Sequence, residues 1–260
     1  MKGLLSTKIL PLTLKRQRRG LIMKKRIVKC LIRFLICGIF FTFNGAFIVS
    51  AQNKGGPMLK YLGRASVKIT TINGTVIYID PYAGTDYSDP ADLILVTHGH
   101  DDHNAVGKVT KKPETLIIAG PNAVSGGPNV KFVKTGDNLK EKGIGIKAVA
   151  ASNANHPADR NCGFILFFDG IVFYHAGDTS MNSSMTQLAA LNITYALLPV
   201  DGYYNMNAAN AMKCADLIKA KWNIPIHSDP KNDYNESNVK AFTLPNTIRL
   251  KPGDSIELKP

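Results

Sequence analysis

Short apolar runs, most of them with the alternation of a β-strand, dominate the sequence from residue 66 onward. An Asn-Gly pair at 73–74 and an Asp-Gly pair at 169–170 separate neighbouring runs, as they do in tight β-hairpins. The pattern predicts strands at residues 66–70, 76–79, 93–96, 116–119, 131–133, 144–149, 164–168, 171–174, 196–200, 224–227 and 247–250.

Helical periodicity is scarcer and falls late in the chain. It is clearest at residues 208–221 and weaker at 184–191 and 236–242. Many short strands followed by a few helices predict two sheets packed face to face and covered by helices. We assign this α/β arrangement to one domain, residues 52–260.

Residues 1–51 have a different character and are predicted to be an N-terminal leader. From Met23 they read as a signal peptide, with basic residues at 24–33, an apolar stretch at 34–49 and small residues before Gln52. This predicts export, to the periplasm or out of the cell, and a mature protein that begins near Gln52. The alternative is an uncleaved membrane anchor, although the apolar stretch is shorter than the ~20 residues that a span prefers.

The formal net charge of +13 suggests nucleic-acid binding at first sight, but its distribution argues against it. Of the 32 basic side chains, 11 lie in residues 1–51, which hold no acidic side chain. Residues 52–260 therefore carry 21 basic and 19 acidic side chains, too even a balance for a typical binder of the phosphate backbone. The two cysteines of this part, Cys162 and Cys214, form no C-x-x-C unit and are expected to be separate buried thiols.

The densest cluster of metal-ligating residue types directly follows the apolar run 93–96. Its members are His98, His100, Asp101, Asp102 and His103. Side chains two apart in an extended segment point the same way, so His98 and His100 are predicted to bind one metal. Asp102 and His103 are then predicted to bind a second metal, with Asp101 as a spacer between the two pairs of ligands. Imidazole and carboxylate ligands suit zinc, iron or manganese.

Three further candidate ligands lie far downstream. His156, Asp178 and His227 each follow or adjoin an apolar, strand-like run. Ligands at several strand ends are expected to converge on one rim of a packed sheet. A histidine alone would by default be a core or loop residue, and Asp178 alone a turn residue, so their assignment depends on the cluster at 98–103.

The H-x-H-x-D-H pattern of residues 98–103 resembles the metallo-β-lactamase-fold hydrolases. The resemblance covers nearly all of residues 52–260 and implies a four-layer αββα sandwich. It implies a first metal bound by His98, His100 and His156. It implies a second metal bound by Asp102, His103 and His227, with Asp178 bridging the two.

Further segments resemble the branch that contains the ascorbate-phosphate lactonase and N-acyl-phosphatidylethanolamine phospholipase D. They are residues 62–66, 79–81, 174–179, 204–206 and 224–227. Two positions depart from that branch: Arg64 stands where it has His, and Ser228-Asp229 replaces an aromatic-glycine continuation. Arg64 is expected either to bind an anionic group of the substrate or to be a surface substitution.

Three other residues are candidates for supporting roles. Asp80 either holds a ligand loop through hydrogen bonds or merely ends a strand. His175 is the histidine without a ligand role and is expected behind the ligands or in the core. Tyr204 either lines the substrate pocket or belongs to a plain surface loop.

Together these residues predict an exported hydrolase with two divalent ions, zinc first, with manganese or iron as alternatives. A hydroxide bridging the ions would attack a lactone, a phosphodiester or phospholipid, or an amide. Asp102 would be catalytic, orienting this nucleophile and passing its proton to the leaving group. The expected partner is a small-molecule or lipid substrate, not nucleic acid, and no oligomeric state follows from the sequence. The alternative is a non-catalytic metal-binding or sensing protein with the same fold.

Overall fold

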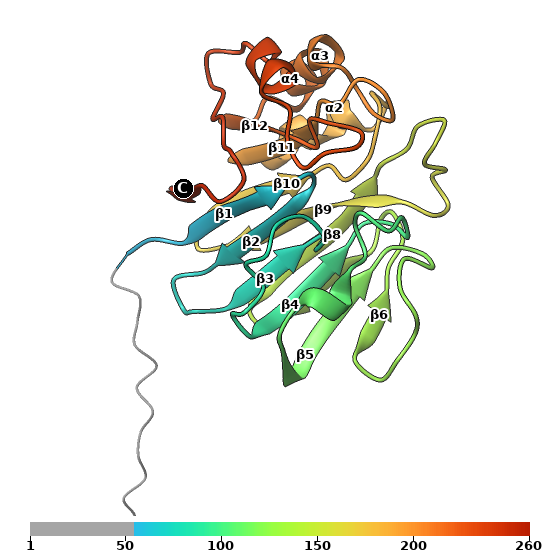
Figure 1. Cartoon of the computed structure of the whole chain (residues 1–260), viewed down its shortest axis with the longest axis vertical. Coiled ribbons are helices and arrows are strands. Elements are labelled where there is room, and N and C mark those ends of the chain that lie inside the picture. The colour runs from blue at the N-terminus through green and yellow to red at the C-terminus, as the bar shows by residue number, and fades with distance from the viewer. Residues whose placement is uncertain (1–54) are drawn as a thin grey trace, which may run out of the picture. The chain divides into compact units, whose positions relative to one another are not determined.

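The alternating segments form two β-sheets in the computed structural model, which describes residues 55–260 (Figure 1). The first sheet runs in the order β13 (Ser255–Glu257), β1 (Met58–Gly63), β2 (Ser66–Thr70), β3 (Val76–Ile79), β4 (Ala91–Val96), β5 (Lys111–Ala119) and β6 (Val130–Phe132). The second sheet runs in the order β12 (Trp222–Ile226), β11 (Tyr195–Pro199), β10 (Ile171–His175), β9 (Cys162–Phe168), β8 (Ile144–Ala150) and β7 (Asn138–Glu141).

The predicted leader lies outside the described residues, and so do the proposed start at Met23 and the cleavage before Gln52. Among residues 55–260, no helix has both the length and the apolar character that crossing a membrane requires.

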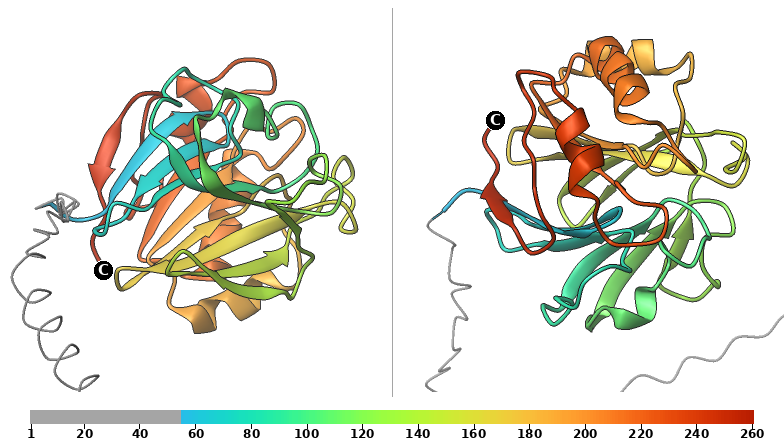
Figure 2. Two further views of the ribbon diagram at one scale, coloured as in Figure 1. Left: turned by 90° about the horizontal axis from the view of Figure 1, so that it is seen from below. Right: turned by 45° about the horizontal axis from the view of Figure 1, so that its top comes forward.

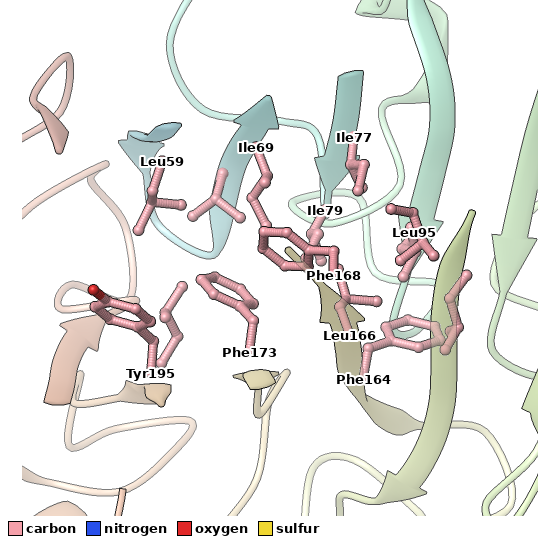
Figure 3. Packing of buried hydrophobic residues seen from close by; sticks show 14 of the residues in the cluster. Leu59, Ile69, Ile77, Ile79, Leu95, Phe164, Leu166, Phe168, Phe173 and Tyr195 are labelled. Atoms are coloured by element: carbon pink, nitrogen blue, oxygen red, sulfur yellow. The ribbon is translucent and has the colours of Figure 1, made fainter. Parts of the chain in front are cut away.

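The two sheets pack through a core of large apolar side chains (Figure 3). Leu59, Ile69 and Leu95 of the first sheet face Phe164 and Phe173 of the second, and all five are fully buried. Burying side chains of this size contributes roughly 1.5–3 kcal/mol each. This core gives the strand ends a rigid base, which a site built from loops requires.

The outer faces of the two sheets are covered differently (Figure 2). Helices α2 (Met185–Leu188), α3 (Ala208–Ile218) and α4 (Glu236–Ala241), with the short turn η2 (Ala189–Leu191), lie together over the second sheet. Ala211 and Cys214 of α3 pack in one cluster with Ala196 and Leu198 of β11.

Among residues 55–260, the turn η1 (Val106–Lys108) and loops cover the outer face of the first sheet. Tyr87, Val109 and Ala123 from these loops pack against Ile94 and Val96. The predicted sandwich is therefore confirmed, and within the described residues its fourth layer is built from loops and one turn.

The strand prediction holds for ten of the eleven segments and is wrong for residues 247–250. That segment runs beside β12 but makes only one isolated bridge, Asn223 to Thr247. The prediction also missed β1, β7 and β13. β7 and β13 are short and mostly polar, so they carry little of the alternation that identifies a strand.

Candidate metal centre

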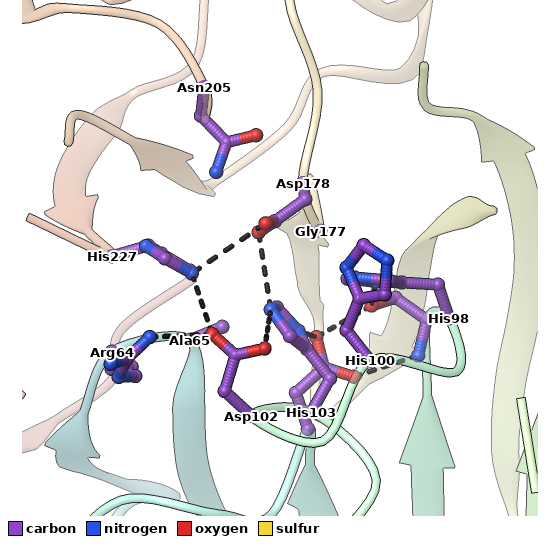
Figure 4. A network of polar contacts seen from close by, with 12 residues as sticks. Arg64, Ala65, His98, His100, Asp102, His103, Gly177, Asp178, Asn205 and His227 are labelled. Atoms are coloured by element: carbon purple, nitrogen blue, oxygen red, sulfur yellow. Dashed lines mark hydrogen bonds and ion pairs between the residues drawn. The ribbon is translucent and has the colours of Figure 1, made fainter. Parts of the chain in front are cut away.

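Every residue predicted to bind metal belongs to one cluster at the strand ends, and Figure 4 labels all of them except His156. The loop with His98, His100, Asp102 and His103 follows β4, and His227 directly follows β12. Asp178 comes three residues after the end of β10, and His156 lies in the loop between β8 and β9. Strands from both sheets therefore contribute to one cluster.

Asp80 fixes the loop that follows β4. Its Oδ1 accepts a hydrogen bond of 2.7 Å from the Thr97 amide, and its Oδ2 accepts one of 2.7 Å from the Thr97 hydroxyl. The same Oδ2 lies 2.8 Å from His103 Nδ1. Asp80 is fully buried, so it holds the ligand loop rather than merely ending a strand.

A glycine makes the approach of Asp178 possible. Gly177 has φ +61°, and a Cβ there would lie 3.0 Å from the Cys162 carbonyl oxygen and 3.1 Å from Thr97 Cβ. Only glycine tolerates this conformation without strain in so narrow a space. The turn brings the Asp178 carboxylate into the middle of the cluster, where it is buried.

The first group of candidate ligands is His98, His100 and His156, which we call the imidazole group. One ring nitrogen from each of the three histidines lies within 4.8 Å of the other two. His98 Nε2 is 3.1 Å from His100 Nδ1.

The second group is Asp102, His103 and His227, which we call the carboxylate group. Its ligand atoms also lie within 4.8 Å of one another. His227 Nε2 lies 3.5 Å from Asp102 Oδ2, and His103 Nε2 lies 3.9 Å from Asp102 Oδ1.

Asp178 lies between the two groups. Its Oδ2 is 3.2 Å from His156 Nε2 and 3.6 Å from His227 Nε2, and its Oδ1 is 3.4 Å from His103 Nε2. These contacts reach the imidazole group on one side and the carboxylate group on the other. Asp101, predicted to be a spacer, belongs to neither group.

The donor atoms fit divalent metal ions. Three buried atoms in the middle of the cluster, His103 Nε2, His227 Nε2 and Asp178 Oδ1, have no hydrogen-bond partner among the described residues. Leaving such atoms unpaired is costly unless a cation binds them. Ligands about 2.0–2.1 Å from a tetrahedral zinc lie about 3.3 Å apart, close to the separations around Asp178.

Most of the imidazoles are held through their other nitrogen, which is how metal-ligating histidines are usually oriented. His98 Nδ1 lies 3.1 Å from Thr97 Oγ1, and His156 Nδ1 lies 2.8 Å from Asn153 Oδ1. His227 Nδ1 lies 3.3 Å from Asp201 Oδ2. This orientation leaves the Nε2 atoms facing the centre of the cluster.

The sequence analysis missed Asn153 and Asp201. Asp201 follows the predicted strand 196–200, so its place at a strand end was the available signal. Its contact with His227, however, is tertiary. Asp201 Oδ1 also accepts hydrogen bonds from the amides of Tyr203 and Tyr204, both at 2.7 Å, so it organises the loop beside the cluster.

The ionisation of the two groups differs in the metal-free protein. Burial lowers the pKa of His98 to about 2, and burial also lowers the pKa of His156. Burial opposes protonation of His227, but Asp178, Asp102 and Asp201 outweigh it and raise its pKa to about 9. Asp178 and Asp80 likewise raise the pKa of buried His103.

The carboxylates respond in the opposite direction. Burial alone would raise the pKa of Asp102 and of Asp178, but the neighbouring imidazoles, His227 first, lower both pKa values below the usual range. The carboxylate group and Asp178 therefore form a buried network of ion pairs at neutral pH.

Two cavities open beside the cluster. The larger, about 550 Å³, is lined by Arg64, Tyr82, Tyr204 and Pro230, and by residues of both ligand groups. The smaller, about 430 Å³, is lined by the three imidazole-group histidines and by Arg160, among others. A small-molecule substrate therefore has room to reach the candidate ligands.

The remaining candidates take distinct places. Arg64 is only 7 % exposed, and its Nη1 donates a hydrogen bond of 2.6 Å to Asp102 Oδ2, so it is no surface substitution. His175 is buried behind the ligands, with Nε2 2.8 Å from the Ala65 carbonyl oxygen. Tyr204 lines the larger cavity and is 42 % exposed.

Comparison with known proteins agrees with this architecture. Residues 58–227 match the family described as the β-lactamase superfamily domain, and the chain belongs to this family. A UPF0173 metal-dependent hydrolase of Methanoregula boonei is 34% identical over 226 residues, which cover 78% of this chain and 98% of that protein.

Solved structures are similar as well. A protein of Parabacteroides distasonis, assigned as a metal-dependent hydrolase, is 30% identical with a TM-score of 0.63, covering 74% of this chain and 90% of its own. The metallo hydrolase Igni18 of Ignicoccus hospitalis, 24% identical with a TM-score of 0.62, covers 78% of this chain and 99% of its own and shows the shared fold. These matches place the chain among the metal-dependent hydrolases of the superfamily.

Proposed function

We propose that this chain is an exported hydrolase with two divalent metal ions, zinc first, that acts on a lactone, a phosphodiester or phospholipid, or an amide. The observation that supports two ions is the position of Asp178, whose oxygens lie 3.2–3.6 Å from ligand nitrogens of both groups. The imidazole group would hold one ion, the carboxylate group the other, and Asp178 would contact both.

Two bound divalent ions would supply a hydroxide nucleophile at neutral pH and positive charge beside the substrate oxygen. The protein's residues would do the rest. Asp201 contacts His227, and Asp80 contacts His103. These two histidines would help to keep the Asp102 carboxylate in place where it lines the larger cavity. From there Asp102 would orient the nucleophile and move its proton to the leaving group.

The larger cavity favours an enzyme over the alternative of a non-catalytic metal-binding or sensing protein. A protein that kept only metal binding would have no need for a cavity of about 550 Å³ that opens onto both ligand groups. Export remains a proposal that rests on residues 24–51 alone. It is tested by N-terminal sequencing of the secreted protein, with a start near Gln52 as the expected result and a start at Met1 as the contrary one.

The catalytic proposal is tested with the zinc-loaded full chain on a panel of lactones, bis-p-nitrophenyl phosphate, phospholipids and amides. We expect turnover of at least one class, lost in Asp102→Ala and kept in Asp101→Ala, which removes a neighbouring carboxylate outside both groups. Mass spectrometry should find two metal equivalents. Turnover of no class above the Asp102→Ala background would favour the non-catalytic alternative.

A further inference from the structure

Arg64 occupies a strained and well-fixed position beside the carboxylate group. The backbone of Arg64 has φ +46°, and that of the candidate ligand His227, which contacts it, has φ +43°. The Arg64 amide donates to the Asp233 carbonyl at 2.8 Å, and the Arg64 carbonyl accepts from the His227 amide at 2.7 Å. The backbone of Arg64 is thus tied directly to a candidate metal ligand.

The Arg64 side chain is held just as firmly. Its Nη1 donates to Asp102 Oδ2 at 2.6 Å, and its guanidinium carbon lies 5.4 Å from the centre of the Tyr82 ring. Its Nε is buried 3.9 Å from Asp233 Oδ1 and has no hydrogen-bond partner within residues 55–260. Burying a guanidinium is costly, and pairing with Asp102 is the main compensation that the structure offers.

This ion pair constrains the Asp102 carboxylate. Arg64 approaches Asp102 from one side, and His103 lies on the other (Figure 4). With Oδ2 bound to Arg64, Oδ1 points toward His103 Nε2, at 3.9 Å. The carboxylate is therefore oriented toward the other members of its group by a partner that is not itself a ligand candidate.

We propose that Arg64 is a positioning residue: it holds Asp102 in the orientation that completes the carboxylate group, so metal binding there depends on Arg64 while binding at the imidazole group does not. This inference rests on the proposed two-metal function. Partners that orient metal ligands typically change metal affinity 10- to 100-fold when they are removed.

Arg64 could instead weaken metal binding at the carboxylate group through its charge. A guanidinium is always charged and would repel a nearby divalent cation. If repulsion outweighed positioning, removing Arg64 would tighten metal binding at the carboxylate group. The direction of the change therefore distinguishes the two roles.

The experiment measures zinc affinity of the full chain by competition with a chromophoric chelator. His98→Ala leaves the carboxylate group as the main site, and His227→Ala leaves the imidazole group. In the His98→Ala background, Arg64→Met should weaken zinc binding roughly 10- to 100-fold. In the His227→Ala background it should change nothing.

Two further variants separate positioning from general damage. Arg64→Lys keeps a cation and one donor for Asp102 Oδ2, so it should recover most of the lost affinity. Arg249→Met serves as the control, because among residues 55–260 the hydrogen bond that Arg249 donates goes to the Phe242 carbonyl, at 2.7 Å, and Arg249 lines neither cavity. It should leave zinc binding unchanged in both backgrounds.

Unchanged or tighter zinc binding in Arg64→Met, or equal weakening in both backgrounds, would overturn the role of Arg64. The proposed function fails in a different way. If the unsubstituted chain binds fewer than two zinc ions, the two-metal proposal falls. If it binds two and Arg64→Met still binds both normally, only the inference about Arg64 falls.

Discussion

The imidazole group and the carboxylate group lie side by side, share Asp178 and yet differ in charge and protonation. Two histidines of the imidazole group are neutral, because burial lowers the pKa of His98 to about 2 and lowers the pKa of His156. The carboxylate group contains Asp102, and the pKa values of its histidines are raised, that of His227 to about 9. His98 and His156 can therefore bind a cation directly at neutral pH, whereas His103 and His227 must first release protons.

This difference shows that similar ligands are prepared for metal in two ways. At His98 and His156, burial outweighs the nearby Asp178 carboxylate and keeps the imidazole deprotonated. At His103 and His227, several carboxylates together outweigh burial, so they keep the imidazole protonated and form ion pairs with it until a metal replaces the protons. The first arrangement favours uptake at any neutral pH, and the second makes uptake depend on pH.

Asp178 is the residue that belongs to both sides of the comparison, so its loss should have the largest effect. Asp178→Ala removes contacts to His156, His103 and His227 at once. Metal ions supply several kcal/mol of transition-state stabilisation, so we expect hydrolysis to fall roughly a thousand-fold or more. Steady-state kinetics on whichever substrate class is turned over would measure this, with Asp101→Ala as the control. A loss of less than tenfold would contradict a role shared by both groups.

The protonation difference predicts the next largest effect. Zinc must displace the protons that His227 and His103 hold because their pKa values are raised, so affinity at the carboxylate group should rise at least tenfold for each pH unit as the pH increases from 6.5 toward 9. Affinity at the imidazole group should stay nearly flat over the same range. Chelator competition in the His98→Ala and His227→Ala backgrounds measures the two separately. Parallel pH profiles would remove the distinction between the groups.

Asn153 and Asp201 sharpen the comparison because each contacts the histidine of a different group, although Asn205 hydrogen-bonds to both. Asp201→Ala frees His227, and Asn153→Ala frees His156. Each should weaken zinc binding at its own group toward the lower end of the 10- to 100-fold range and leave the other group unaffected. Titration of the two single-site backgrounds would show it. If either substitution weakened both groups equally, the groups would be one coupled unit.

The sequence predicted the centre better than it predicted what supports it. The ligands carry a local signal, because the H-x-H-x-D-H spacing and the strand-end positions of His156 and His227 are visible along the chain. The Arg64–Asp102 ion pair joins residues 38 positions apart, and no local pattern indicates it. The partner of His227, Asp201, likewise depends on where β11 and β12 end relative to one another.

The fold shows the same limit. Buried strands such as β4 and β9 have nearly continuous apolar residues and were predicted, whereas β7 and β13 depend on pairing with a neighbour and were missed. The outer face of the first sheet is covered by loops, and apolar residues in loops have no period to detect. Local periodicity therefore predicts the layers that form the core and misses the parts that are ordered only by contact with them.

The smallest expected effect concerns the stability of the metal-free protein. The raised pKa of His227 contributes stability that is fully present below pH 6.5 and is lost as the pH rises through about 9. The lowered pKa of His98 acts oppositely: its contribution is present above pH 6.5 and is lost as the pH falls below that value. Stability of the metal-free chain should therefore be greatest near pH 6.5.

Thermal unfolding with and without a chelator tests this profile. Each kcal/mol corresponds to roughly 2–4 °C in Tm for a domain of this size, so the change on either side of the maximum should be several degrees. His227→Gln should remove part of the alkaline decline, and His98→Gln part of the acidic one, because each group causes one slope. Excess zinc should flatten the alkaline side, since a bound cation replaces the proton that His227 loses. A metal-free Tm that stays constant from pH 6.5 to 9 would mean that the carboxylate group holds no displaceable proton, and the contrast between the two groups would disappear.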